Sequence, residues 1–95
     1  MNARDVIRRP LVTEKTMAGM RDGRFTFEVD IHANKVEIRK AVEEIWPVNV
    51  VSVNTAIVPG KVRRQGRTAG QRPDWKKAIV TLREGQTISA FEGLL

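Results

Sequence analysis

The segment from Arg24 to Ile31 most constrains the fold, because polar and apolar residues alternate along it without a break. This period of two is typical of a strand that buries one face. We therefore predict a half-buried strand whose apolar face carries Phe25, Phe27, Val29 and Ile31. Gly23 supplies the turn before it.

A helix is predicted directly after this strand. The Asn34 side chain can accept the backbone N–H three residues on, and Glu37 can reach back to the cap. Pro47 disfavours helical geometry at Trp46, so the helix should end there. Trp46 is expected to lie in the core or at its rim. The apolar stripe at helical spacing consists of Ile38, Ala41, Val42 and Ile45.

Further elements follow from composition and turn residues. Residues 48–58 are rich in β-branched side chains and predict a strand, with a bulge where the apolar phase shifts between Val50 and Val51. After the shift, alternate residues from 51 to 57 should share one face. Residues 78–82 predict the last strand. Near the N-terminus we expect a short edge strand over residues 5–7 and a short helix capped by Thr13. Residues 86–95 look like a partial helical turn and a tail.

These elements predict an α+β fold. Their order is β-α-β-α-β-β, which gives a four-stranded antiparallel or mixed sheet with helices packed on it. The chain of 95 residues has the length of one domain, so we expect residues 1–95 to form a single domain. A long basic loop, over residues 60–77, should connect the last two strands.

The charge of the chain is concentrated in that loop. Residues 61–77 carry seven basic side chains and one acid, Asp74, whereas the rest of the chain carries ten of each sign. The loop therefore holds the whole net charge of +6. A solvated loop is the usual explanation of a short charged run. The concentration of all the net positive charge in one segment of an otherwise neutral domain instead favours a polyanionic partner.

The loop also has the chemistry of a nucleic-acid contact. About 15 residues without secondary-structure pattern, rich in glycine, are uncommon in a compact domain and are usually functional or disordered. Arginine suits phosphate and stacks on bases, and lysine adds mobile charge. Trp75 either stacks on a base or covers the edge of the sheet. The candidate RNA-binding residues are Lys61, Arg63, Arg64, Arg67, Arg72, Trp75, Lys76 and Lys77.

Several other classes of protein are disfavoured. Without cysteine the chain has no disulfide or thiolate metal site, which favours an intracellular setting. We read no signal peptide and no membrane-spanning run. His32 is the only histidine, and a surface or capping role is expected for it rather than catalysis. Gly60-Lys61 lacks the upstream glycine and the following Ser or Thr of a phosphate-binding loop. We expect no enzyme, no metal, no cofactor and no small-molecule substrate.

Four motifs, in order and with matching spacing, resemble the family of large-subunit ribosomal protein twenty-three. The first is Arg9-Pro10-Leu11-Val12-Thr13-Glu14-Lys15-Thr16, and the second is Asn34-Lys35-Val36-Glu37-Ile38. The third joins Val53-Asn54-Thr55 to the loop pattern of residues 59–67 and 72–78. The fourth is Glu84-Gly85-Gln86. The resemblance runs over nearly the whole chain.

This resemblance implies a place on the large ribosomal subunit, in the cytoplasm. Family members bind the main (23S-type) rRNA, contact neighbouring ribosomal proteins and lie beside the exit of the nascent-chain tunnel, with the basic loop extending along rRNA. Glu14 matches the docking site for trigger factor, which is near that of the signal recognition particle. Glu14 also suits the first turn of a helix, where the dipole favours an acid, and both roles are compatible. A free-standing RNA- or DNA-binding module and a protein-binding adaptor are the alternative hypotheses.

Overall fold

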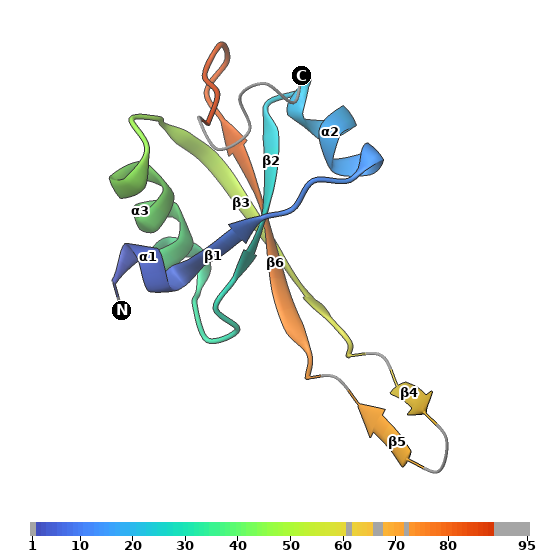
Figure 1. Ribbon diagram of the computed structural model, residues 1–95. Helices are drawn as coiled ribbons and strands as arrows, with labels where there is room; N and C mark the ends of the chain where they lie inside the picture. Colours follow the sequence, from blue (N-terminus) through green and yellow to red (C-terminus); the bar gives the residue numbers. More distant parts are fainter. Residues whose placement is uncertain (1, 61, 66–67, 72, 89–95) are drawn as a thin grey trace.

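The computed structural model describes residues 2–60, 62–65, 68–71 and 73–88, with side chains described for residues 2–60 and 73–88. Within these ranges the chain forms three helices and six strands, which are labelled in Figure 1. In chain order they are α1 (Ala3–Val6), β1 (Ile7–Pro10), α2 (Glu14–Met20), β2 (Arg24–Val29), α3 (Lys35–Ile45), β3 (Val50–Val58), β4 (Val62–Gln65), β5 (Thr68–Gln71) and β6 (Trp75–Leu82).

Four of the strands form one antiparallel sheet in the order β1-β2-β6-β3, and β4 pairs with β5 in a separate two-stranded sheet. The predicted α+β class and the β-α-β-α-β-β order are confirmed for the main sheet. The structure adds α1 before it and the β4–β5 hairpin between its last two strands. A partial helical turn and a tail were predicted over residues 86–95: residues 86–88 are neither helix nor strand, and residues 89–95 lie outside the described ranges.

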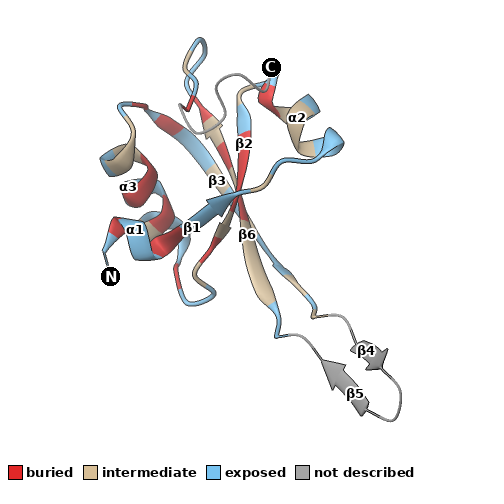
Figure 2. Ribbon diagram, viewed as in Figure 1, coloured by how far each residue is buried: buried red, intermediate tan, exposed pale blue. Residues whose placement is uncertain are grey.

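The core lies between the sheet and the layer made by α1 and α3 (Figure 1), and buried positions gather there in Figure 2. Phe25, Phe27 and Val29 of β2 face this layer beside alternate residues of β6, and the apolar stripe of α3 packs on them. The ring of Trp46 stacks on Phe27 with centroids 5.4 Å apart, so the prediction that Trp46 belongs to the core or its rim is confirmed.

The ends of two predicted strands are wrong. Ile31 is not on the buried face: β2 ends at Val29, the Asp30 N–H donates to the Val6 carbonyl, and Ile31 is exposed in the turn before α3. At the N-terminus, residues 3–6 are helical, and β1 begins only at Ile7. Periodicity cannot locate such ends, because they depend on where a neighbouring strand stops pairing.

The predicted bulge in β3 is confirmed. The register with β6 shifts between Val50, opposite Leu82, and Ser52, opposite Thr81. Val51 is the extra residue and is 66% exposed, so its predicted place on the same face as Val53 is wrong. The bulge returns Val53 to the core side, opposite Val80.

Side-chain caps define where α2 and α3 begin. In α3, the Glu37 N–H donates to Asn34 Oδ1 at 2.8 Å, and the Asn34 N–H donates to Glu37 Oε1 at 3.2 Å. In α2, Thr13 and Thr16 form the corresponding reciprocal pair. Both predicted caps are confirmed. As expected, α3 ends before Trp46, which is in an extended conformation ahead of Pro47.

We expect Asn34→Ala to lower the free energy of unfolding by about 1 kcal/mol, because it leaves an N-terminal N–H of α3 without its acceptor. Urea denaturation measures this destabilisation. Asn34→Asp keeps an acceptor oxygen at the same position and serves as the matched control. An equal effect in both variants would show that the hydrogen bond at the cap does not stabilise the helix.

Candidate nucleic-acid interface

Between β3 and β6, the described residues 62–65 and 68–71 pair as β4 and β5, a hairpin that projects from the domain (Figure 1), where the sequence predicted a loop without secondary structure. β4 and β5 are antiparallel, with Arg63 opposite Gly70 and Arg64 opposite Ala69. The radius of gyration is 14.8 Å, against about 12–13 Å for a compact chain of this length. The hairpin therefore extends the molecule away from its core.

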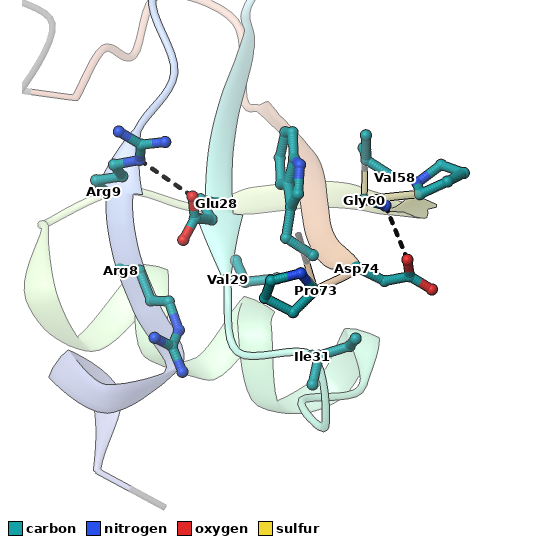
Figure 3. Close-up of a pocket in the computed structure, with 11 residues that line it drawn as sticks. Arg8, Arg9, Glu28, Val29, Ile31, Val58, Gly60, Pro73 and Asp74 are labelled. Atoms are coloured by element: carbon teal, nitrogen blue, oxygen red, sulfur yellow. Dashed lines mark hydrogen bonds and ion pairs between the residues drawn. The ribbon is translucent and has the colours of Figure 1, made fainter. Parts of the chain in front are cut away.

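The base of this hairpin is held by the only acid of the basic segment. The Gly60 N–H donates to Asp74 Oδ1 at 2.8 Å, as Figure 3 shows. Pairing of β3 with β6 stops one step earlier, at Val58 opposite Trp75. Pro59 and Pro73 stand just beyond that pair and have no N–H to continue the ladder. The one negative charge of residues 61–77 thus lies at the base of the hairpin, away from β4 and β5.

Among the predicted RNA-binding residues, Arg63 and Arg64 lie on β4. Trp75, Lys76 and Lys77 begin β6, at the base of the hairpin. Lys61, Arg67 and Arg72 lie outside the described residues. The structure therefore places five of the eight predicted residues on the hairpin or at its base.

The two lysines of β6 face opposite sides of the sheet. Lys76 lies opposite Val29 and Ile57, on the side covered by α1 and α3, and its Nζ donates to the Ala33 carbonyl. Lys77 lies opposite Glu28 and Ala56, on the other side. Lys76 thus ties the base of the hairpin to the residue before the α3 cap, and Lys77 is presented on the side away from the core.

Two arginines that sequence reasoning left out of the site lie near the base of the hairpin. Arg8 and Arg9 of β1 line a cavity of about 830 Å³ together with Pro73, Asp74 and Trp75 (Figure 3). Antiparallel pairing of β1 with β2 brings them there. In the sequence, these two arginines are adjacent, but they lie outside residues 61–77, in the part of the chain whose basic and acidic residues balance. There was therefore little reason in the sequence to include them in the site.

Acids of β2 and of the turn after it neutralise these arginines. Arg9 Nε donates to Glu28 Oε1 at 3.1 Å, and Arg8 Nη2 lies 3.3 Å from Asp30 Oδ2. The His32 backbone N–H donates to Asp30 at 2.8 Å; this bond and then Arg8 lower the pKa of Asp30 below its ordinary value of 3.8. Asp30 therefore stays ionised and paired at neutral pH. This edge of the sheet is close to neutral, unlike the hairpin.

Glu14 is exposed in the first turn of α2, after the Thr13 cap. In Figure 1, α2 lies near the end of the sheet opposite the hairpin. The candidate docking residue and the basic hairpin are therefore on separate parts of the surface.

His32 is exposed, as expected. Within the described ranges, no three histidines, aspartates or glutamates are grouped so that they could hold a metal ion. None of the helices in those ranges is long and apolar enough to cross a membrane.

Comparison with known proteins identifies the family. The family model described as ribosomal protein L23 matches residues 5–90. The chain belongs to this family. Large ribosomal subunit protein uL23 of Symbiobacterium thermophilum is 56% identical over 94 residues, which cover 99% of this chain and all of the relative. The protein of the same name from Roseiflexus castenholzii is 55% identical over 98% of this chain and 99% of its own length.

The L23 family match extends over the neutral domain and the hairpin together. Its range, residues 5–90, contains every element from β1 to β6, as well as Glu14 and the whole basic segment. The four motifs that suggested this family from the sequence thus fall on the capped start of α2, the capped start of α3, β3 with the hairpin and its base, and the turn after β6.

We expect Lys76→Met to lower the free energy of unfolding by about 1–3 kcal/mol, because it deprives the Ala33 carbonyl of a charged donor. Urea denaturation checks this effect. Lys77→Met removes the same charge from the other face of the sheet and should change stability little. Equal stabilities of the two variants would show that the hydrogen bond to Ala33 does not stabilise the fold.

Proposed function

We propose that this protein is a structural, non-enzymatic component of the large ribosomal subunit that binds large-subunit (23S-type) rRNA through residues 60–77. The observation that carries this proposal is that the whole net charge of +6 falls within residues 61–77, a segment whose described strands β4 and β5 project from an otherwise neutral domain. Membership of the ribosomal protein L23 family supports it. The relatives named above carry the name of large-subunit ribosomal proteins.

Binding follows from the charge and shape of the hairpin. A narrow two-stranded ribbon can enter a groove or crevice of folded RNA that is too small for the whole domain. Arginine offers several N–H donors in one plane to phosphate oxygens, and each such interaction releases counterions. We assign these phosphate interactions to Lys61, Arg63, Arg64, Arg67 and Arg72 and, at the base, to Lys77, whereas Trp75 at the base would contact RNA by stacking. The bond to Ala33 gives Lys76 a structural role instead.

The rest of the proposal concerns the surroundings of the protein. We propose that it lies beside the exit of the nascent-chain tunnel of cytoplasmic ribosomes, in contact with neighbouring large-subunit proteins. Glu14 then provides a docking point for trigger factor, close to where the signal recognition particle binds. The exposure of Glu14 and its distance from the hairpin along the sheet support a division of the surface between RNA and protein partners.

The double variant Arg63→Ala/Arg64→Ala tests RNA binding. We expect the slope of log affinity against log salt to fall by about 0.7–0.9 for each phosphate that the variant no longer neutralises. Filter binding of large-subunit rRNA at several salt concentrations measures this slope. Lys35→Ala/Lys40→Ala removes the same charge from the exposed side of α3 and is the matched control. A slope that is unchanged in the hairpin variant would refute the proposal.

Sedimentation separates the ribosomal role from a free-standing RNA-binding module. We expect the tagged protein to sediment with large subunits in high salt. A free module would stay in the supernatant, even if it bound isolated rRNA. Partners that remain attached after nuclease digestion would favour the protein adaptor.

For trigger factor, we expect Glu14→Gln to weaken binding to ribosomes about tenfold, because it removes a charge from the docking surface and leaves the size of the side chain unchanged. Co-sedimentation of trigger factor with ribosomes that contain the variant measures this effect. Glu44→Gln changes an exposed acid on α3 in the same way and serves as the control. Equal binding to both ribosomes would remove Glu14 from the docking site.

A further inference from the structure

A groove of about 790 Å³ runs between α2 and the side of the sheet that α1 and α3 leave uncovered. This volume falls within the range of about 300–1,000 Å³ that is usual for sites that hold a small organic group. Trp75 and Ile79 of β6 line the sheet side of the groove, and Leu11 and Ala18 line the side of α2 and the chain before it. These walls are largely apolar, which suits a flat aromatic group more than a free phosphate.

Trp75 connects this groove to the hairpin. It is the first residue of β6, it directly follows Asp74 at the base of the hairpin, and it is half-buried. It lines both the groove and the cavity around Arg8 and Arg9. The stacked ring pair Phe27–Trp46 lies on the opposite, helix-covered side. In the part of the chain that the structure describes, the ring of Trp75 has no aromatic partner.

The groove is also positively charged. Lys15, Arg24 and Lys77 line it, against one acid, Asp22. Asp22 pairs with Arg24 at 3.1 Å, and Glu28, which faces Lys77 across the strands, pairs with Arg9 at 3.1 Å. Neither Lys15 nor Lys77 has a carboxylate within 4.0 Å among the residues with described side chains. The two lysines are therefore available to an external anion.

We propose that this groove receives one unpaired base of the RNA held by the hairpin, with the base stacked on Trp75 and the adjoining phosphate bound by Lys77 and Lys15. The proposal rests on the proposed function, because the same RNA occupies both places. Apolar walls, free ammonium groups and continuity with the hairpin together favour a nucleotide over an apolar protein segment, which would leave both lysines without a partner.

Two substitutions of Trp75 separate stacking from the alternative in which its ring only covers the sheet edge. Trp75→Leu keeps apolar bulk but has no aromatic ring, whereas Trp75→Phe keeps a ring. We expect Trp75→Leu to weaken binding of large-subunit rRNA about 5- to 150-fold, the range that corresponds to removal of one base–aromatic stack. Trp75→Phe should restore most of the affinity. Neither variant should change the salt slope, because neither removes a group that neutralises phosphate.

Fluorescence reports on the ring directly. In a Trp46→Phe protein, Trp75 is the only tryptophan, and we expect its emission to be quenched when protein-free rRNA binds. This measurement also covers the case in which Trp75→Leu does not fold. Unquenched emission with RNA bound would overturn the proposal, as would equal affinities of the Leu and Phe variants. Quenching by a ribosomal protein but not by rRNA would make a protein the occupant and would also overturn it.

The results of these tests show which of the two proposals is wrong, base binding in the groove or RNA binding by the hairpin. If Arg63→Ala/Arg64→Ala lowers the salt slope and the Trp75 variants have no effect, only the groove proposal fails. If the slope is unchanged in the arginine variant, hairpin binding itself fails.

Discussion

Antiparallel pairing of β3 with β6 connects the two parts of this molecule, because the same two strands complete the core sheet and lead into the hairpin. On the core side, Val50 and Val53 stand opposite Leu82 and Val80. At the hairpin end of these strands the pairing stops at Val58 and Trp75. The hydrogen bond from the Gly60 N–H to Asp74 then holds together the two segments that lead into the hairpin. Register errors in this pairing would both unpack the core and displace the hairpin.

The structure pairs the basic residues of β1 with acids and leaves the excess positive charge in residues 61–77. Acids of β2 and of the following turn neutralise Arg8 and Arg9 where β1 pairs with β2, and Asp74 is used at the base of the hairpin. The excess positive charge lies in residues 61–77, whose described strands β4 and β5 project from the domain and whose last two lysines begin β6. Such an arrangement concentrates the attraction to a polyanion in one part of the surface.

Much of the fold could be predicted from local patterns. The caps at Thr13 and Asn34, the end of α3 before Pro47 and the bulge near Val51 each depend on a few neighbouring residues, and all were found. The predictions failed where pairing between distant segments determines whether a residue belongs to a strand. Ile31 continues the alternation but lies beyond Val29, the last paired residue of β2. The basic segment was predicted to be a loop because its glycines and charged residues do not show the alternation typical of strands, although β4 and β5 pair there.

The sequence by itself determined which residues carry the excess charge, where the helices begin and which family the motifs resemble, since these properties are local or are counted along the chain. Only the tertiary structure decided what surrounds those charges. It placed Arg8 beside Asp30, directed the ammonium of Lys76 to Ala33 and left Lys77 on the open face. The physical reason is that adjacent residues of a strand face opposite sides, and only the neighbouring strands and helices determine which side is covered.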